Sequence, residues 1–353
     1  YCTLFFEYSA IKVSHPTPYL RTLTMSSDSE FQYVLSTAHN SLTSGQSIHV
    51  TGCAGSGKTH LIKQLIRLLA SVRGGDNRIV ICGTTAISAL AVGGDTIHRA
   101  SGLGSLYLRT VAKHRKKTVS QVCQHIQDEI RYKHIQYRKA LQFLRFTRFL
   151  IIDEVSMLHT HFWAVLCRLL QIYRKNTLPC GGVAVCMVGD FTQLPPVYPD
   201  CVDPIFAQPL FTQQSWTDMK MPTLCLKTSR RQNDARFLRI LNNLRHNRLT
   251  ASDINSLRTR LVTPDEKTPP EDAVRVFATR KRVSDYNNAC LDRTAEANPV
   301  TRMSGIVSYI GPFTQNHLWY WRRRLDNVFV VPYTLSANIG TRVMHRANYT
   351  GHN

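Results

Sequence analysis

The sequence predicts an α/β fold in which a parallel sheet presents a glycine-rich loop at the carboxyl end of one strand. β-prone, mostly apolar runs occupy 47–50, 78–82, 149–153 and 183–190, and helical patterns separate them. Strands that alternate with helices form parallel sheets, and ligands bind at the carboxyl ends of such strands. Each of the four predicted strands ends at a polar motif, so the predicted fold and the motifs agree.

Helices are predicted at 60–70 and 162–174, where apolar residues recur at helical spacing. A second α/β region is predicted from residue 221 onward, with a helix within 224–246 and a strand at 274–280. We expect three parts of the chain: a tail at 1–25 outside the core, a first domain at 26–220 that includes a basic helical segment at 105–148, and a second domain at 221–353.

The composition is strongly basic and shows no metal-binding cysteine pattern. The chain has 44 Lys and Arg residues against 23 Asp and Glu residues, a formal net charge of +21. This excess indicates a polyanionic partner such as nucleic acid, and a basic surface that serves only solubility is the alternative. No apolar run reaches the ~20 residues of a membrane-spanning helix, so we expect a soluble protein with no membrane partner. The ten cysteines form no CxxC pair, which favours free thiols.

The glycine-rich loop at 52–59 reads GCAGSGKT and matches the phosphate-binding pattern GxxxxGK[ST]. Glycines allow backbone amides to turn around phosphate oxygens, and the following helix adds its positive N-terminal end. Lys58 supplies a positive charge for the β and γ phosphates, and Thr59 supplies a hydroxyl for Mg²⁺. The flanking strand and helix argue against a chance turn. The candidate nucleotide-binding residues of the loop are Gly52, Gly55, Ser56, Gly57, Lys58 and Thr59.

An acidic pair follows the predicted strand at 149–153, within the stretch FLIIDEVSML. Asp153 is suited to hold Mg²⁺ through water, and Glu154 is suited to act as the general base for an attacking water. The alternative is a surface turn after a core strand. Because a phosphate-binding loop lies upstream, we favour the catalytic interpretation.

Two further motifs offer side chains to a nucleotide. Gln193, in VGDFTQLPPV, follows a predicted strand and is placed to reach a γ-phosphate or its attacking water. Arg230 and Arg231, in KTSRRQND, offer a guanidinium that stabilises charge in phosphoryl transfer. The alternative for the two arginines is the solvated start of a basic helix.

In their order and in their residues, these motifs resemble those of the PIF-type (petite integration frequency) DNA helicases, the RecD-like branch of superfamily 1B. The resemblance extends over about residues 30–353. The resemblance rests on GCAGSGKT, IIDEVSML, GDFTQLPPV, LKTSRRQNDARFLRILNNLRHNRL and VFATRKRVSDYNNACL. It implies a RecA-like P-loop NTPase domain followed by an incomplete second RecA-like domain.

The resemblance also implies roles for single residues. Arg231 falls on the family's nucleotide-sensing arginine, whereas Arg230 replaces its usual phenylalanine, and Gln32 falls on an adenine-reading glutamine. The segment TTAISALAVGGDTIHRASGLG at 84–104 is similar to one that contacts single-stranded DNA. The candidate DNA contacts there are Thr85, Gly93, Gly94 and His98, and a core histidine is the alternative for His98.

Two other stretches leave a DNA role open. The segment 109–148 has eleven Lys and Arg residues against two acidic ones and includes KHRKK, which is also compatible with a nuclear address. A solvated helical hairpin is the alternative to a DNA-facing role. The stretch HLWYWRRRL at 317–325 interleaves aromatics with arginines, but a strand with buried tryptophans fits its spacing slightly better.

Family membership implies that ATP and Mg²⁺ are the cofactors and that ATP hydrolysis drives 5′→3′ movement on single-stranded DNA and unwinding of forked or structured DNA. The processes implied are replication, repair, recombination and telomere maintenance. A monomer in the nucleus or mitochondrion is expected, and a viral or mobile-element origin stays open.

The match to the family stops before two later motifs of its second domain. We therefore expect either a fragment of a longer product or a decayed copy, which binds ATP and DNA weakly, hydrolyses slowly and unwinds inefficiently by itself. The competing functions are a truncated or decayed P-loop protein that binds nucleic acid without efficient unwinding, and a P-loop ATPase of another kind.

Overall fold

The computed structural model describes residues 27–72, 78–113, 116–196, 202–261, 273–294, 300–304 and 334–339. These residues belong to two compact units, Tyr1–Leu257 and Arg258–Asn353, and each is described by itself. The predicted tail at 1–25 and the stretch at 317–325 lie outside the described residues.

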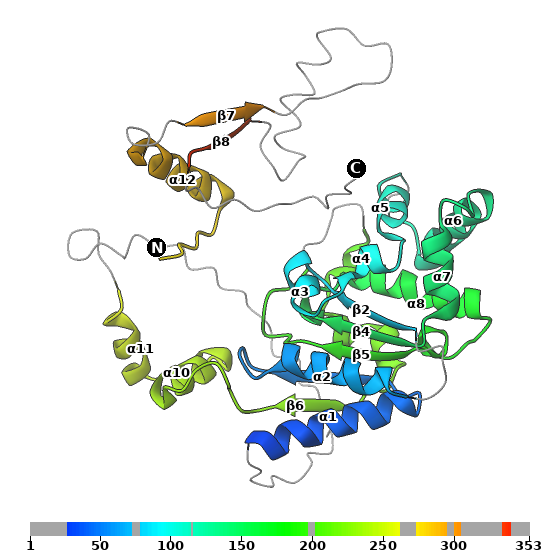
Figure 1. The fold of residues 1–353 in the computed structure, drawn as a ribbon, viewed down its shortest axis with the longest axis horizontal. Helices are drawn as coiled ribbons and strands as arrows, with labels where there is room; N and C mark the ends of the chain where they lie inside the picture. Colours follow the sequence, from blue (N-terminus) through cyan, green and yellow to red (C-terminus); the bar gives the residue numbers. More distant parts are fainter. Residues whose placement is uncertain are drawn as a thin grey trace. The chain divides into compact units, whose positions relative to one another are not determined.

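A six-stranded parallel sheet forms the centre of the first unit, in the order β3-β2-β4-β5-β1-β6 (Figure 1). The prediction of an α/β fold with a parallel sheet is confirmed, and the four predicted strands correspond to β1, β2, β4 and β5. The strands are β1 Ile48–Gly52, β2 Ile79–Gly83, β3 Asp95–Thr96, β4 Phe149–Asp153, β5 Ala184–Val188 and β6 Thr223–Leu226.

Helices cover both faces of this sheet (Figure 1). The covering helices are α1 Ser27–Thr43, α2 Lys58–Ala70, α3 Ala86–Ala91, α4 Ile97–Ala100, α5 Gly104–Lys113, α6 Val119–Tyr132, α7 Arg138–Phe146, α8 Thr160–Arg174 and α9 Gln214–Thr217. Two further helices, α10 Ala235–Arg245 and α11 Ala251–Arg258, follow β6 and do not cover the sheet. Short 3₁₀ helices lie at Val155–Met157, Pro179–Gly182, Pro204–Ala207 and Leu210–Thr212. The basic segment expected to be helical contains α5, α6 and α7, while its DNA-facing role stays a prediction.

The central strand β4 is buried on both faces, as expected for a parallel strand between two helical layers. Phe149 and Ile151 point into the apolar cluster with α1 and α2. Leu150 and Ile152 point into the opposite cluster, which α4 to α8 complete. Because side chains alternate along a strand, this apolar run supplies both halves of the core and fixes the position of the acidic pair at its end.

β6 changes the expected domain boundary at residue 220. The strand pairs with β1, with Thr223 opposite His49, and Leu224 and Leu226 are buried against α1 and α2. Its side chains alternate between exposed and buried, which is the pattern of an edge strand with one covered face. The strand therefore belongs to the first unit, which extends to Leu257.

The described part of the second unit contains α12 Arg280–Thr294 and an antiparallel pair of strands, β7 Thr301–Ser304 and β8 Thr334–Ala337. The strand predicted at 274–280 does not form. Val274 and Val276 are 84% and 91% exposed, and α12 begins at Arg280. β-branched residues suit a strand only where neighbouring strands and a core surround them, and this stretch has neither among the described residues.

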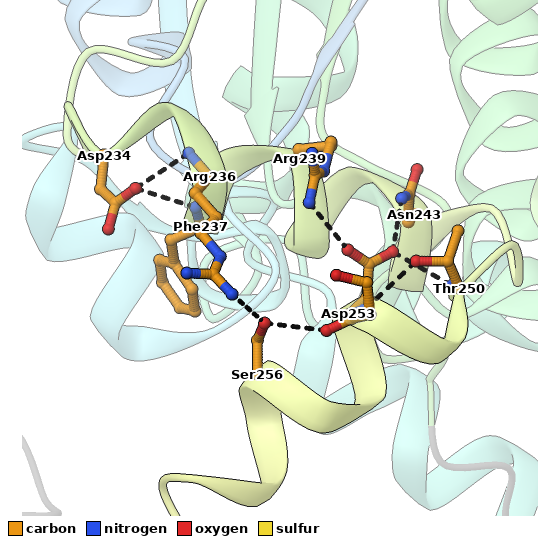
Figure 2. Close-up of polar contacts among 9 residues, drawn as sticks. Asp234, Arg236, Phe237, Arg239, Asn243, Thr250, Asp253 and Ser256 are labelled. Carbon is orange, nitrogen blue, oxygen red and sulfur yellow. Dashed lines mark hydrogen bonds and ion pairs between the residues drawn. The ribbon is translucent and has the colours of Figure 1, made fainter.

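α10 and α11 form a helical hairpin held by a buried carboxylate. Asp253 accepts hydrogen bonds from Asn243 Nδ2 at 2.8 Å and from the Thr250 amide at 3.1 Å, and it pairs with Arg239 at 3.4 Å (Figure 2). At the other end of the hairpin, Asp234 caps α10 by accepting from two backbone amides of its first turn. The hairpin directly follows the KTSRRQND motif.

Asp253→Asn is expected to lower the melting temperature of the chain at neutral pH. Hydrogen bonds from Asn243 and Thr250, aided by the charge on Arg239, lower the pKa of Asp253 from 3.8 to about 2. A carboxyl group whose folded pKa is depressed stabilises the fold above its unfolded pKa and loses that contribution as the pH falls through the folded value. The difference from wild type should therefore narrow between about pH 4 and pH 2.

Thermal melts over a pH series check this prediction, with the exposed Asp292→Asn as the matched control. A difference between Asp253→Asn and wild type that is the same at every pH would contradict it.

Candidate nucleotide-binding site

The glycine-rich loop joins the end of β1 to the start of α2, as predicted. Gly55 and Gly57 have φ values of 79° and 94°, in the left-handed region that favours glycine. A Cβ atom added to Gly55 would lie 2.6 Å from the Cβ of Arg231, so a side chain there would displace the arginine segment. The loop is also joined to this segment by the Arg230 amide, which donates to the Gly55 carbonyl at 2.8 Å.

A cleft of about 300 Å³ lies beside the loop and gathers most of the predicted catalytic side chains. They come from the loops that follow β1, β4, β5 and β6, which end at the same edge of the sheet because the strands are parallel. The cleft is lined by Ala54, Gly55, Gly57, Lys58, Thr59, His60, Glu154, Gln193, Arg230 and Arg231.

Lys58 and Ser56 present polar groups suited to a phosphate. Lys58 is largely buried, and its Nζ donates to the carbonyls of Gly52 at 2.7 Å and Cys53 at 3.0 Å. The Ser56 hydroxyl is buried and has no hydrogen-bond partner among the described residues. Lys58 lines the cleft, so an anion there meets its positive charge, and the loop fits a phosphate chain.

Thr59 and Asp153 form a donor set suited to a magnesium ion. The Thr59 hydroxyl donates to Asp153 Oδ2 at 3.5 Å, and Asp153 Oδ1 accepts from the Glu154 amide at 2.9 Å. Burial raises the pKa of Asp153 to about 6, and the charge on Glu154 adds to the rise. The carboxylate is therefore the main form at pH 7, which is the form that binds a cation.

Glu154 reaches the cleft from an uncommon backbone conformation. Its φ of 56° lies in the left-handed region, at the junction between β4 and a 3₁₀ helix. The Thr84 hydroxyl donates to the Glu154 carbonyl at 2.8 Å and holds this turn. Backbone strain kept by surrounding contacts is frequent at functional sites, and here it directs a carboxylate into the cleft.

The two arginines have different surroundings. Arg230 Nη2 donates to Asp28 at 3.0 Å, and the Arg230 guanidinium lies 5.0 Å from the centre of the Phe31 ring, so this side chain joins α1 to the loop. Arg231 shows no ion pair among the described residues, and it packs against the Gly55 backbone. Arg231 is thus the better placed of the two to meet a nucleotide.

The structure does not bring Gln32 to the cleft. Gln32 is exposed on α1 and is absent from the cleft lining, whereas its neighbour Phe31 contacts the ring of His60, with centroids 5.4 Å apart. His60 lines the cleft and was missed by the sequence reasoning. The sequence signal that could have identified His60 is its position directly after Thr59, in the first turn of α2.

The candidate DNA contacts lie on the segment around α3 and α4, outside the cleft lining. Thr85 caps α3 by accepting from the Ser88 amide at 3.1 Å. A Cβ atom on Gly94 would lie 2.3 Å from the Ile81 carbonyl, so packing explains this glycine, whereas Gly93 faces open space.

His98 stacks on Phe162 with ring centroids 4.3 Å apart, and burial lowers the pKa of His98. It therefore has a packing role in the structure. Two apolar residues on α3, Ile87 and Leu90, are 72% and 82% exposed and were not predicted.

Within the described residues, none of the helices combines the length and the apolar character needed to cross a bilayer.

Comparisons with known proteins identify the family that the chain resembles. A family model described as PIF1-like helicase matches residues 22–250. The ATP-dependent DNA helicase PIF1 of Candida albicans is 30% identical over 335 residues, which cover 91% of this chain and 33% of the relative. The ATP-dependent DNA helicase RRM3 of Saccharomyces cerevisiae is 31% identical over 239 residues, which cover 67% of this chain and 30% of the relative.

The crystal structure of the Candida albicans Pif1 helicase aligns with a TM-score of 0.68 at 28% identity, over 90% of this chain and 64% of that one. Compared with the curated PIF1 of Candida albicans and RRM3 of Saccharomyces cerevisiae, this chain spans about a third of their length.

Proposed function

The chain belongs to the PIF1-like helicase family, and we propose that it binds and hydrolyses ATP to drive a DNA helicase. The observation that carries the proposal is the cleft, where Lys58, Glu154, Gln193 and Arg231 converge from four separate loops. A charged lysine, a carboxylate base, an amide and an arginine are the groups that phosphoryl transfer to water requires.

In the proposed reaction, loop amides and Lys58 bind the phosphate chain of ATP. Thr59 and Asp153 would hold Mg²⁺, which would supply positive charge against the phosphate oxygens. Glu154 accepts the proton of the attacking water at its carboxylate, and Gln193 orients that water. Arg231 stabilises the charge that develops on the γ-phosphate oxygens.

The proposed polymer substrate is single-stranded DNA, with forked or structured DNA ahead of it and 5′→3′ movement. The net charge of +21 and the names of the relatives support a DNA substrate. Thr85, Gly93, Gly94 and His98 are the proposed contacts, on a segment separate from the cleft. The same proposal places a monomer in the nucleus or mitochondrion. Because Gln32 does not line the phosphate cleft, the proposal assigns it to an adenine that lies outside this cleft.

ATP hydrolysis measured with and without single-stranded DNA tests the proposal. Slow hydrolysis that DNA accelerates is expected, together with DNA binding that weakens as salt rises. Binding of ATP and DNA without DNA-stimulated hydrolysis would favour a nucleic-acid-binding protein. A chain that binds no ATP would refute the proposal.

A further inference from the structure

We propose that Asp190 and Arg245 form a positioning pair that holds Gln193 at the cleft and fastens the α10–α11 hairpin to it. The contribution of the pair to hydrolysis rests on the proposed function. Its structural part, the attachment of the hairpin, does not.

A single buried carboxylate joins these elements. Asp190 lies just after β5, and its side chain is 2% exposed. One of its oxygens, Oδ1, accepts from the amide and the hydroxyl of Thr192, at 3.1 Å and 2.8 Å. The other, Oδ2, accepts from Gln193 Nε2 at 3.2 Å and from Arg245 Nη1. The cleft residue and the hairpin residue thus share one acceptor oxygen.

Arg245 provides the compensating charge for this carboxylate. Burial would raise the pKa of Asp190, but hydrogen bonds from Thr192 and Gln193 and the charge on Arg245 outweigh it and lower the pKa. The nearby His49 offers no positive charge at pH 7, because burial lowers its pKa to about 4. An unpaired buried charge is strongly unfavourable, so the carboxylate holds Arg245 in place.

The position of Arg245 on α10 connects the Asp190 carboxylate to the hairpin. Arg245 is the last residue of α10, whose first residue follows the motif that carries Arg231. α10 is joined to α11 through Asp253 (Figure 2), and α11 ends at the boundary of the second unit. Because Gln193 and Arg245 donate to the same oxygen of Asp190, loss of Arg245 disturbs the carboxylate that holds Gln193 and also releases the hairpin.

Hydrogen exchange on the full 353-residue chain tests the pair directly. Arg245→Met keeps an unbranched side chain but removes the charge and the guanidinium donors, and we expect about tenfold faster amide exchange in α10 and in residues 191–194. Arg245→Lys keeps a charge and should remain within about twofold of wild type. Arg248→Met, at an exposed arginine just beyond α10, is the matched control and should not change exchange.

A double variant separates positioning from stability. Asp190→Asn with Arg245→Met leaves no buried unpaired charge, so its unfolding midpoint should return toward that of wild type. Its α10 amides should nevertheless exchange about as fast as those of Arg245→Met, because the attachment is lost. If α10 exchange matches the Arg248→Met control in both the single and the double variant, the pair has no positioning role.

Steady-state hydrolysis gives the catalytic readout. Arg245→Met is expected to lower kcat about tenfold while KM for ATP stays within about twofold, since a displaced Gln193 weakens the reaction more than binding. A wild-type chain that neither binds nor hydrolyses ATP would overturn the proposed function, while the exchange experiment would still decide the attachment.

Discussion

Glu154→Gln is expected to lower ATP hydrolysis by about 10²- to 10⁴-fold while ATP affinity stays within about threefold of wild type. The amide keeps the size of the carboxylate and its place at the end of β4, but it does not accept a proton from water. Lys58, Thr59 and the loop amides, which form the proposed phosphate site, are unchanged by the substitution. Single-turnover hydrolysis and titration with a fluorescent ATP analogue measure the two effects separately.

Glu129→Gln makes the same chemical change on α6, where, within the described part of the chain, the carboxylate pairs with Lys133 in the next helical turn. This control should hydrolyse ATP at the wild-type rate. Full turnover by Glu154→Gln would mean that another group is the base.

Arg231→Ala is expected to lower hydrolysis by about 10³- to 10⁵-fold, the effect of removing an arginine that stabilises transition-state charge. The residue lies on the cleft wall within the same unit as the phosphate loop, so its guanidinium needs no second domain to be close to the nucleotide. Rapid-quench hydrolysis at saturating ATP measures the loss.

Arg230→Ala is the matched comparison, because the two arginines are neighbours on the same wall. Arg230 is engaged by Asp28 and Phe31, so its removal should loosen α1 and raise KM with a smaller loss in kcat. The opposite order of kcat losses would assign the charge-stabilising role to Arg230.

The sequence predicted the sheet and the cleft well because both depend on local patterns. The FLIID strand is a continuous apolar run that ends in an aspartate, and the GCAGSGKT loop has a glycine pattern that few other folds use. The edge strand β6 was harder to predict, because an alternation of side chains over only four residues does not distinguish an edge strand from coil. The exposed Val274 and Val276 show the converse, because strand propensity without a partner gives no strand.

The contacts between distant segments were not predictable from motifs. Asp190 belongs to a motif that the sequence analysis identified, but its partner Arg245 looks like any other arginine on a basic helix. The same holds for Gly94, just before β3, whose requirement for glycine comes from the Ile81 carbonyl on β2. Such pairs are set by tertiary packing, which a single sequence does not specify.

The strand order has a consequence for how the protein is made on the ribosome. β1 is translated before both of its neighbours in the sheet: His49 pairs with Met187 on one side and with Thr223 on the other. A nascent chain that has not reached Thr223 contains the whole GCAGSGKT motif but lacks the strand and the arginine segment that pack against it. Until Thr223 is translated, β1 lacks its β6 neighbour, so we expect nucleotide binding to follow the synthesis of this segment.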